Sequence, residues 1–143
     1  MKIPYTDKVS LIKNYIYKKW QIQWNEDNAR KTNKLHAIKP ELGPPYLVHT
    51  SRKDQVVLNR IRLGHSRITH SFLMENDKIK PKCHFCNSGF ELTIKHILID
   101  CMFFTAIRSN YYSNIHNMKD LFDNINPNNI LGFLKETTLY QKF

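Results

Sequence analysis

Three cysteines and one histidine stand at a spacing that could hold a metal ion. Cys83, Cys86, His96 and Cys101 follow the order C-x2-C-x9-H-x4-C, which uses every cysteine of the chain. Two thiolates separated by two residues can reach the same ion, and four donors complete a tetrahedral zinc shell. A Cys3His set predicts a closed structural site, because a catalytic site keeps one coordination position open for water. We therefore predict Zn2+ as the cofactor and expect no catalytic residue.

The alternative interpretation is that the cysteines are small buried hydrophobic residues, because residues 94–103 are largely apolar. Two neighbouring features favour a metal site. Residues 87–89, Asn-Ser-Gly, have a composition typical of a tight turn. Thr93 can cap the helix that carries His96. Since His96 and Cys101 are five residues apart, that helix must end or loosen before Cys101 for both side chains to face one ion.

Length and charge limit the class of protein. A chain of 143 residues with 41% hydrophobic content predicts one domain with a core, or one domain with arms. Its net charge of +10 favours an anionic partner such as nucleic acid or a membrane surface, and simple solubility is the alternative. The sequence holds no apolar run of the roughly 18 residues that span a bilayer, and we expect no membrane association. Residues 1–5 lack the apolar core of a signal peptide, so we expect an intracellular protein of the nucleus or cytoplasm.

Positive charge is concentrated on both sides of the helix-breaking Gly64 and again just before the first cysteine. There Lys78, Lys80 and Lys82 alternate with other residues in a pattern that predicts an extended strand. We predict that the following residues contact nucleic acid: Arg60, Arg62, His65, Arg67, Lys78, Lys80 and Lys82. The alternative for Arg62 and Arg67 is a solvated helix face. Arg60 falls within the apolar arc of its helix, so we expect its stem to be packed and its head to emerge at the edge or to pair with a carboxylate. For His65 and His70 we expect a hydrogen-bonded structural role rather than metal ligation. We expect His84, inside the C-x2-C turn, to point to solvent.

The remaining pattern predicts a mainly α fold, a small helical domain with a zinc-knuckle-like Cys3His hairpin and helix. The first part, residues 1–50, is expected to be a helix over 7–25 followed by a linker, with at most a short extended piece at 35–38, because Pro40, Gly43, Pro44 and Pro45 interrupt regular structure. The second part, residues 51–143, is expected to hold the basic region, the metal site over 83–101 and C-terminal helices. The helices of this second part are predicted over 51–63 and 67–74 before the metal site, and over 102–112, 118–122 and from about 130 onward after it.

The first predicted helix is apolar on two sides. Val9, Ile12, Ile16, Trp20 and Trp24 form one stripe, and Leu11, Tyr15 and Ile22 form a second stripe opposite. We therefore expect this helix to be covered on both faces or to lie against another part of a larger protein. Its tryptophans suit a core more often than stacking on a nucleobase.

Several stretches resemble the region that follows the ribonuclease H domain in non-LTR, jockey-like retrotransposon polyproteins. These are N-R-I-R-L-G-H-S-R-I-T-H-S-F-L at 59–73, C-H-F-C at 83–86 and L-T-I-K-H-I-L-I-D-C at 92–101. The segments I-P-Y-T-D at 3–7 and N-K-L-H-A-I-K-P at 33–40 are similar to the spacer before that region. The resemblance therefore spans nearly the whole chain.

The resemblance implies an accessory segment of a reverse transcriptase protein, binding RNA or single-stranded DNA, with the same four residues as zinc ligands. The parent polyprotein would be an RNA-directed DNA polymerase with ribonuclease H. The sequence has no Y-x-D-D motif and no carboxylate cluster for two metal ions, so we expect a truncated copy without catalysis of its own. The alternative function is a zinc-scaffolded protein interaction module that docks on a polymerase, such as the rest of the polyprotein, or on another partner.

Overall fold

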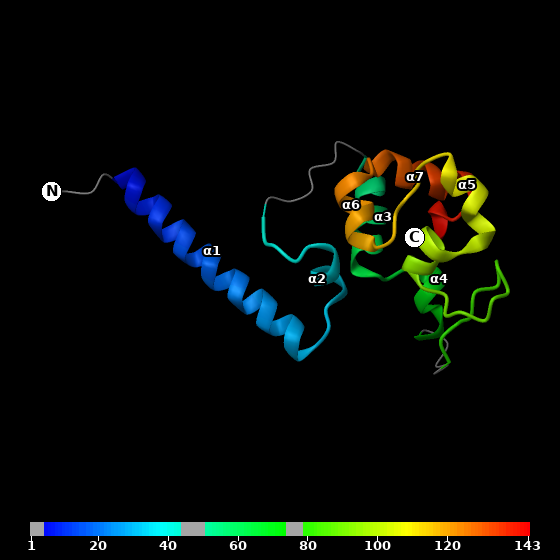
Figure 1. Ribbon diagram of the computed structural model, residues 1–143, viewed down its shortest axis with the longest axis horizontal. Coiled ribbons are helices and arrows are strands. Elements are labelled where there is room, and N and C mark those ends of the chain that lie inside the picture. The colour runs from blue at the N-terminus through cyan, green and yellow to red at the C-terminus, as the bar shows by residue number, and fades with distance from the viewer. Residues whose placement is uncertain (1–4, 44–50, 74–78) are drawn as a thin grey trace. The chain divides into compact units, whose positions relative to one another are not determined.

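The computed structural model describes residues 5–43, 51–73 and 79–143, and these are mainly helical, as the sequence predicts (Figure 1). The chain divides into two compact units, Met1–Tyr46 and Leu47–Phe143, which we describe separately. The first unit holds α1 (Tyr5–Arg30) and α2 (Lys34–Ile38). The second holds α3 (Arg52–Leu63), α4 (Arg67–His70), α5 (Thr105–Ser109), α6 (Met118–Asn124) and α7 (Pro127–Glu136). Short 3-10 turns cover Ser71–Leu73, Met102–Phe104 and Tyr140–Lys142, and a π turn covers His96–Asp100.

The segment after α1 is not the linker that the sequence predicts. α1 continues to Arg30, and residues 34–38 form a short helix instead of an extended piece, capped by the Asn33 side chain. The following backbone is held against α1 by side chains: the indole of Trp24 donates to the carbonyl of Lys39 at 3.1 Å, and Gln21 bonds Pro40 and Leu42. Prolines interrupt regular structure without preventing this docking, since donors from a neighbouring helix satisfy the backbone.

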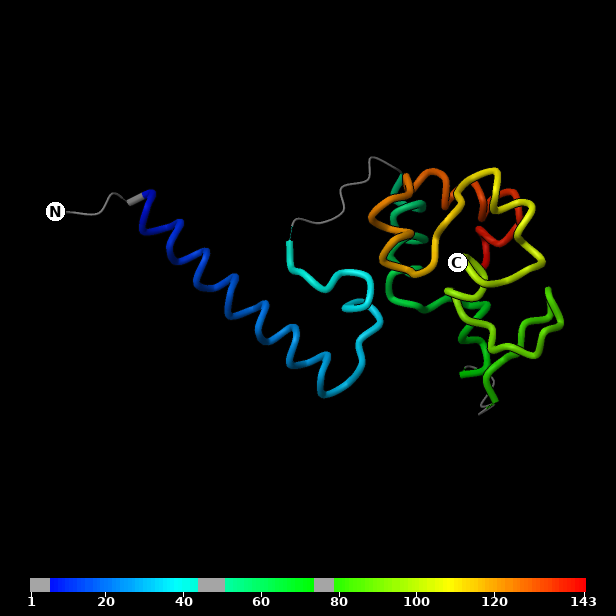
Figure 2. Tube along the Cα trace, viewed as in Figure 1, coloured from blue at the N-terminus to red at the C-terminus, as the bar shows by residue number. Residues whose placement is uncertain are grey.

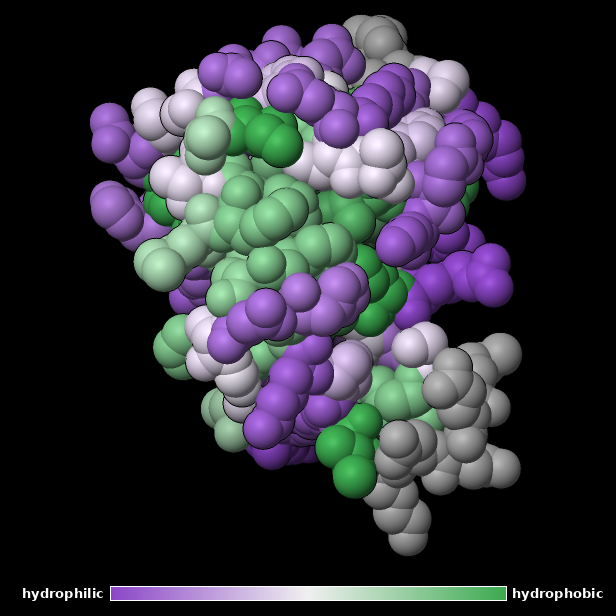
Figure 3. All heavy atoms as spheres, turned by 90° about the vertical axis from the view of Figure 1, so that its right-hand side faces the viewer, coloured by the Kyte–Doolittle hydropathy of each residue, from purple (hydrophilic) through white to green (hydrophobic). Residues whose placement is uncertain are grey.

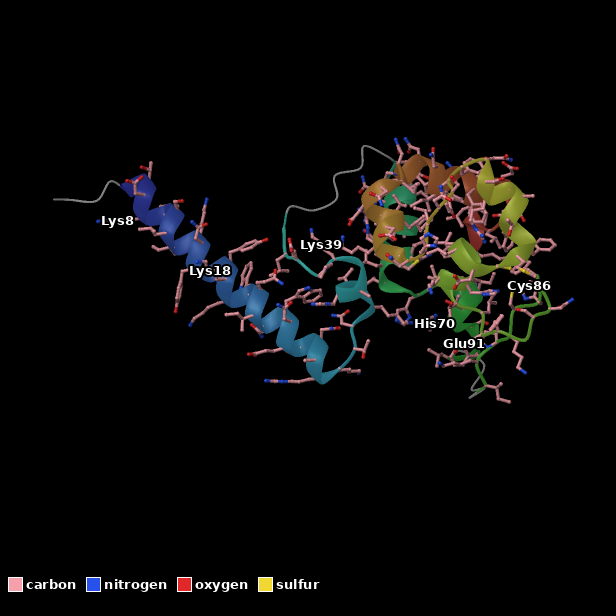
Figure 4. The ribbon with its side chains drawn as sticks, in the orientation of Figure 1. Lys8, Lys18, Lys39, His70, Cys86 and Glu91 are labelled. Atoms are coloured by element: carbon pink, nitrogen blue, oxygen red, sulfur yellow. The ribbon has the colours of Figure 1, made fainter. Side chains whose placement is uncertain are left out.

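The helix α1 leaves much of its apolar surface uncovered. Both predicted stripes contribute, because Ile12 and Trp20 of the first stripe and Leu11 and Ile22 of the second are more than half exposed. Basic side chains lie among them, and Lys8 and Lys18 project from the helix in Figure 4. The expectation of a helix with two apolar sides is therefore met, whereas the covering of both sides is not found within the described residues.

The second unit begins with a side-chain N-cap at Ser51. The Ser51 hydroxyl accepts from the backbone N–H of Asp54 at 3.2 Å, and the helix ends where Gly64 adopts φ 73°. A left-handed residue at this place is favourable for glycine, which has no Cβ to clash. The buried face of α3, with Val57, Leu58 and Ile61, packs toward α7.

The core of the second unit is built around α7. Asn126 caps this helix and Pro127 opens it, so the Asn-Pro pair begins the helix as well as ending the previous segment. The ring of Phe133 is fully buried between Phe104 and Tyr112, each with its centroid 5.8 Å away. Phe104 and Tyr112 follow the predicted metal site at 83–101 closely in sequence. The candidate site is therefore adjacent to the core of the second unit.

Candidate metal centre

The four predicted ligands converge. The ligand atoms of Cys83, Cys86, His96 and Cys101 all lie within 4.8 Å of one another, and none of the cysteines forms a disulfide. The two Sγ atoms of Cys83 and Cys101 are 3.9 Å apart, and Cys86 Sγ lies 3.3 Å from Nε2 of His96. Figure 4 shows Cys86 on the outer loop of the second unit. The structure therefore gathers the residues that the sequence pairs by spacing.

These two distances fit a tetrahedral site. They join four different residues, so they are opposite edges of one tetrahedron. Metal–sulfur bonds of about 2.3 Å and a metal–nitrogen bond of about 2.0 Å, at the tetrahedral angle, require edges of about 3.8 Å between sulfurs and about 3.5 Å between sulfur and nitrogen. These two edges differ from the required values by a few tenths of an ångström, and all four ligand atoms lie within 4.8 Å of one another, so the cluster can close around an ion through shifts of about 1 Å.

A narrow loop carries the first two ligands. We call residues 81–92 the metal-site loop; the chain doubles back there (Figure 2). Cys83 donates to the carbonyl of Phe90, and Leu92 donates to the carbonyl of Pro81, each at 2.8 Å. Asn87 and Gly89 have positive φ, at 49° and 77°, which turns the chain between them as the composition predicts. The extended strand predicted before Cys83 is reduced to the single bridge of Lys82 with Glu91, while Lys78 lies outside the described residues.

A π turn brings His96 and Cys101 together in the candidate metal cluster. Thr93 begins this segment, because its hydroxyl accepts from the His96 N–H at 3.0 Å. Five residues of α-helix would place the two side chains about 140° apart around the axis. Instead the Cys101 N–H donates to the His96 carbonyl at 2.6 Å, an i to i+5 bond that widens the turn. The helix loosens as the spacing predicts, and the loosening takes the form of a π turn.

Arg108 and Tyr112 support this turn, and the sequence analysis did not identify either of them. The guanidinium of Arg108 donates to the carbonyls of Cys101 at 2.8 Å and Ile97 at 3.3 Å. The hydroxyl of the buried Tyr112 donates to the carbonyl of Leu98 at 3.0 Å. A turn that leaves α-helical geometry frees carbonyl groups, and buried carbonyls need donors. The indication that the sequence offers for this support is an arginine seven residues and a tyrosine eleven residues after Cys101.

The cysteines differ in their readiness to lose a proton. Hydrogen bonds from Ser88, by its side chain and its backbone, lower the pKa of the Cys86 thiol to about 6. Burial raises the pKa of the Cys101 thiol to about 11. A metal must therefore displace a proton from Cys101 at neutral pH, while Cys86 offers a thiolate. The serine next to the turn therefore helps to prepare a ligand.

Two arginines of the predicted nucleic-acid surface take part in the fold. Arg60 is exposed, and its guanidinium donates to the main-chain oxygen of Phe143. Arg62 bonds the side-chain oxygen of Asn59 at 2.9 Å and lies 4.9 Å from the centre of the Phe122 ring. A guanidinium over an aromatic face is an attractive pair. These contacts give Arg60 and Arg62 structural roles and leave their contact with nucleic acid a prediction.

The other predicted contacts lie closer to the metal-site loop. Arg67 and Lys82 are exposed, and within the described residues their side chains form no hydrogen bond or ion pair. Lys80 is paired with Glu91 at 3.0 Å, although both remain largely exposed. His65 is exposed with its ring 4.2 Å from that of His70, and His84 points to solvent as expected. Arg67 and Lys82 are therefore the cations best placed to meet an anion.

Aromatic and apolar side chains are exposed around the metal site. Phe90, Met102 and Phe103 are each at least 60% exposed, and Phe85 contacts Phe103 with centroids 6.0 Å apart. We call these residues, Phe85, Phe90, Met102 and Phe103, the aromatic patch. Figure 3 views the side on which α5 and the metal-site loop lie and shows an apolar area bordered by hydrophilic side chains. An exposed apolar area that polar side chains border is more often a binding surface than a surface that only contacts water.

Comparisons with protein-family models, with curated proteins and with solved structures found no match to the chain. Among the described residues, no helix combines the length and the apolar character that crossing a bilayer requires. Inference about function therefore rests on the metal cluster, the charges and the exposed aromatic side chains. The resemblance to retrotransposon polyproteins stays a hypothesis.

Proposed function

We propose that the chain is a zinc-stabilised module that binds single-stranded nucleic acid. The observation that carries this proposal is the placement of a Cys3His cluster beside exposed aromatic rings and beside Arg67 and Lys82, whose side chains have no hydrogen bond or ion pair among the described residues. Cations that are not used by the fold are free to neutralise phosphates, and exposed rings can stack on unpaired bases. Duplex nucleic acid hides its base faces, so the aromatic patch favours a single strand.

Zinc is the ion that the donor set fits best. Three thiolates and one imidazole are soft and borderline ligands, which exclude magnesium and calcium and suit a tetrahedral d10 ion. Cys83, Cys86, His96 and Cys101 would hold the ion, which would join the metal-site loop to the π turn. With four protein ligands the zinc would have a structural role, since it would have no open position for water.

The nucleic-acid test compares affinities at several salt concentrations. Fluorescence anisotropy of the zinc-loaded chain with labelled single-stranded RNA, single-stranded DNA and duplex should show preference for the single strands. Three to five phosphate contacts give a slope of log K against log salt of about −2 to −4 on single strands. The double variant Arg67→Ala, Lys82→Ala should flatten this slope by about one unit. No measurable binding at 50 mM salt, with zinc and fold retained, would overturn the proposal.

In biological terms we propose that the module is an accessory segment of a retrotransposon reverse transcriptase protein. The support is the sequence resemblance, which includes all four members of the metal cluster and the Arg67 stretch. Such a segment would hold the template or target strand while catalysis occurs in another domain. Addition of the chain to a reverse transcription assay with the polymerase of such an element should increase product length on long templates; an equal effect from a Cys86→Ser variant would contradict it.

A second candidate function is a protein interaction module. The observation that favours it is the exposed apolar surface of α1, where Leu11 is 61% and Trp20 62% exposed. Apolar area of this extent marks a surface that another chain covers. The two functions are compatible, because α1 and the metal site belong to different units. Binding of nucleic acid that survives Leu11→Ser and Ile22→Ser would assign α1 to a separate role.

A further inference from the structure

An open groove of about 400 Å³ lies next to the metal site. One wall comes from α4 and contributes Arg67 and Ile68, and another comes from the metal-site loop, with Pro81, His84 and Leu92. Lys142, in the C-terminal 3-10 turn, also lines the groove. Three segments that are distant in sequence thus form one concave surface in the second unit. Its size falls in the range of pockets that hold small organic ligands, about 300–1,000 Å³.

The charge at the edge of the groove is positive and is not used by the fold. The side chains of Arg67 and Lys142 are exposed, and in the described part of the chain neither forms a hydrogen bond or an ion pair. Among the described residues that line the groove, none is acidic. Two cations that face a concavity attract an anion, and a guanidinium can bind phosphate through two parallel hydrogen bonds.

The interior of the groove is apolar and has a rigid base. Ile68, Pro81 and Leu92 supply apolar surface, and Leu92 is almost fully buried. The bond from the Leu92 N–H to the Pro81 carbonyl, at 2.8 Å, holds two of these residues together. The exposed imidazole of His84 stands at the same site. A flat, apolar ring with polar edges would lie against this apolar surface. Ser71 and Gln141 also line the groove and offer groups for hydrogen bonds to the edges of the ring.

We propose that this groove binds one nucleotide unit of a single strand, with the base against Ile68, Pro81 and Leu92 and the phosphates on Arg67 and Lys142. The inference rests on the proposed function and adds the place and the chemistry of recognition. Because Pro81, His84 and Leu92 all belong to the metal-site loop, the groove has its shape only when that loop is folded. Metal binding and nucleotide binding are therefore coupled through the loop.

The direct test is an NMR titration of the 15N-labelled, zinc-loaded full chain with a six-residue oligothymidylate at 50 mM salt. We expect the largest shifts at the backbone amides of Ile68, Ser71, Leu92 and Lys142. Shifts confined to Phe90 and Phe103 would overturn the groove and leave nucleic-acid binding on the aromatic patch. The absence of any shift up to millimolar oligonucleotide would overturn both the groove and the proposed function.

Matched variants give a second readout. Arg67→Ala and Lys142→Ala should each raise the Kd for the oligonucleotide by about fivefold at 0.1 M salt, because each removes one phosphate contact. Arg52→Ala is the control, since Arg52 is an exposed arginine of the same unit that does not line the groove. If Arg52→Ala weakens binding as much as Arg67→Ala, the effect comes from net charge, and the groove is excluded as the nucleotide-binding site. Zinc content and thermal unfolding of each variant establish that the fold is retained.

Discussion

The Cys101 N–H and the His96 carbonyl, 2.6 Å apart, close the π turn that brings two members of the candidate metal cluster together. The bond replaces the i to i+4 pattern that would send the Cys101 side chain to another side of the helix. Arg108 and Tyr112 then occupy the carbonyls that the wider turn exposes. A local departure from helical geometry is thus stabilised by donors from the next segment, and the ligand geometry depends on both.

The purified chain should contain one zinc ion, and the His96→Ala variant should lose most of it. His96 in the π turn supplies Nε2 to the cluster, whereas His84 lies in the metal-site loop with its side chain exposed. Elemental analysis after expression in zinc-supplemented medium measures the content. The matched variant His84→Ala should keep the zinc, and equal loss in both variants would contradict the ligand assignment.

Replacing Arg108 with Met should destabilise the second unit and weaken metal binding. The change leaves the carbonyls of Cys101 and Ile97 without their donor, at a cost of about 1–3 kcal/mol. Urea unfolding and zinc competition with a chelator measure the two effects. The control Arg52→Met removes an exposed arginine that has no such bonds and should change stability by less than about 0.5 kcal/mol.

Gly132→Ala should destabilise the fold because α7 packs directly on a tyrosine. A Cβ atom at position 132 would lie 2.4 Å from Cε1 of Tyr111, closer than packed atoms can stand. The Tyr111 hydroxyl is bonded to Glu136 at 2.6 Å, which limits movement of the ring. We expect a loss of about 1–3 kcal/mol in unfolding free energy.

The control for this contact is a double-mutant cycle. Tyr111→Leu removes the ring that the new Cβ would meet, so Gly132→Ala should cost much less in that background. Additive effects of the two changes would show that the helix, rather than the tyrosine contact, is what alanine disturbs.

Acid should remove a stabilising contact at the start of α3. The Tyr140 hydroxyl, 2.7 Å from Asp54, and then the Ser51 hydroxyl hold the pKa of Asp54 below its usual value. Because the folded pKa is lowered, this contribution is complete above about pH 5 and is lost as pH falls through the folded pKa. The unfolding free energy of the unaltered protein should therefore converge on that of Asp54→Asn between pH 5 and pH 2. A Tyr140→Phe variant, which lacks the hydroxyl, should show a smaller pH-dependent difference from its own Asp54→Asn double.

Local sequence patterns were sufficient to predict several elements of this protein. The helix over 52–63 with its N-cap at Ser51, its end at the left-handed Gly64, and the helix that begins at Thr93 all depend on residues within a few positions of the backbone that they cap. The folded-back segment after α1 was missed for the opposite reason. Its hydrogen bonds come from Gln21 and Trp24, which precede it by up to 21 residues.

The sequence by itself identified the four residues of the candidate metal cluster, because their residue types and spacing admit few other uses, and it determined the mainly helical class through apolar periodicity. Only the tertiary structure decided how His96 and Cys101 meet, which donors stabilise that turn, and which cations of the described residues take part in the fold. Arg62 and Arg67 look alike in sequence, yet one lies over the Phe122 ring and the other lines an open groove. That difference depends on which residues pack beside them, and packing partners come from distant parts of the chain that periodicity does not specify.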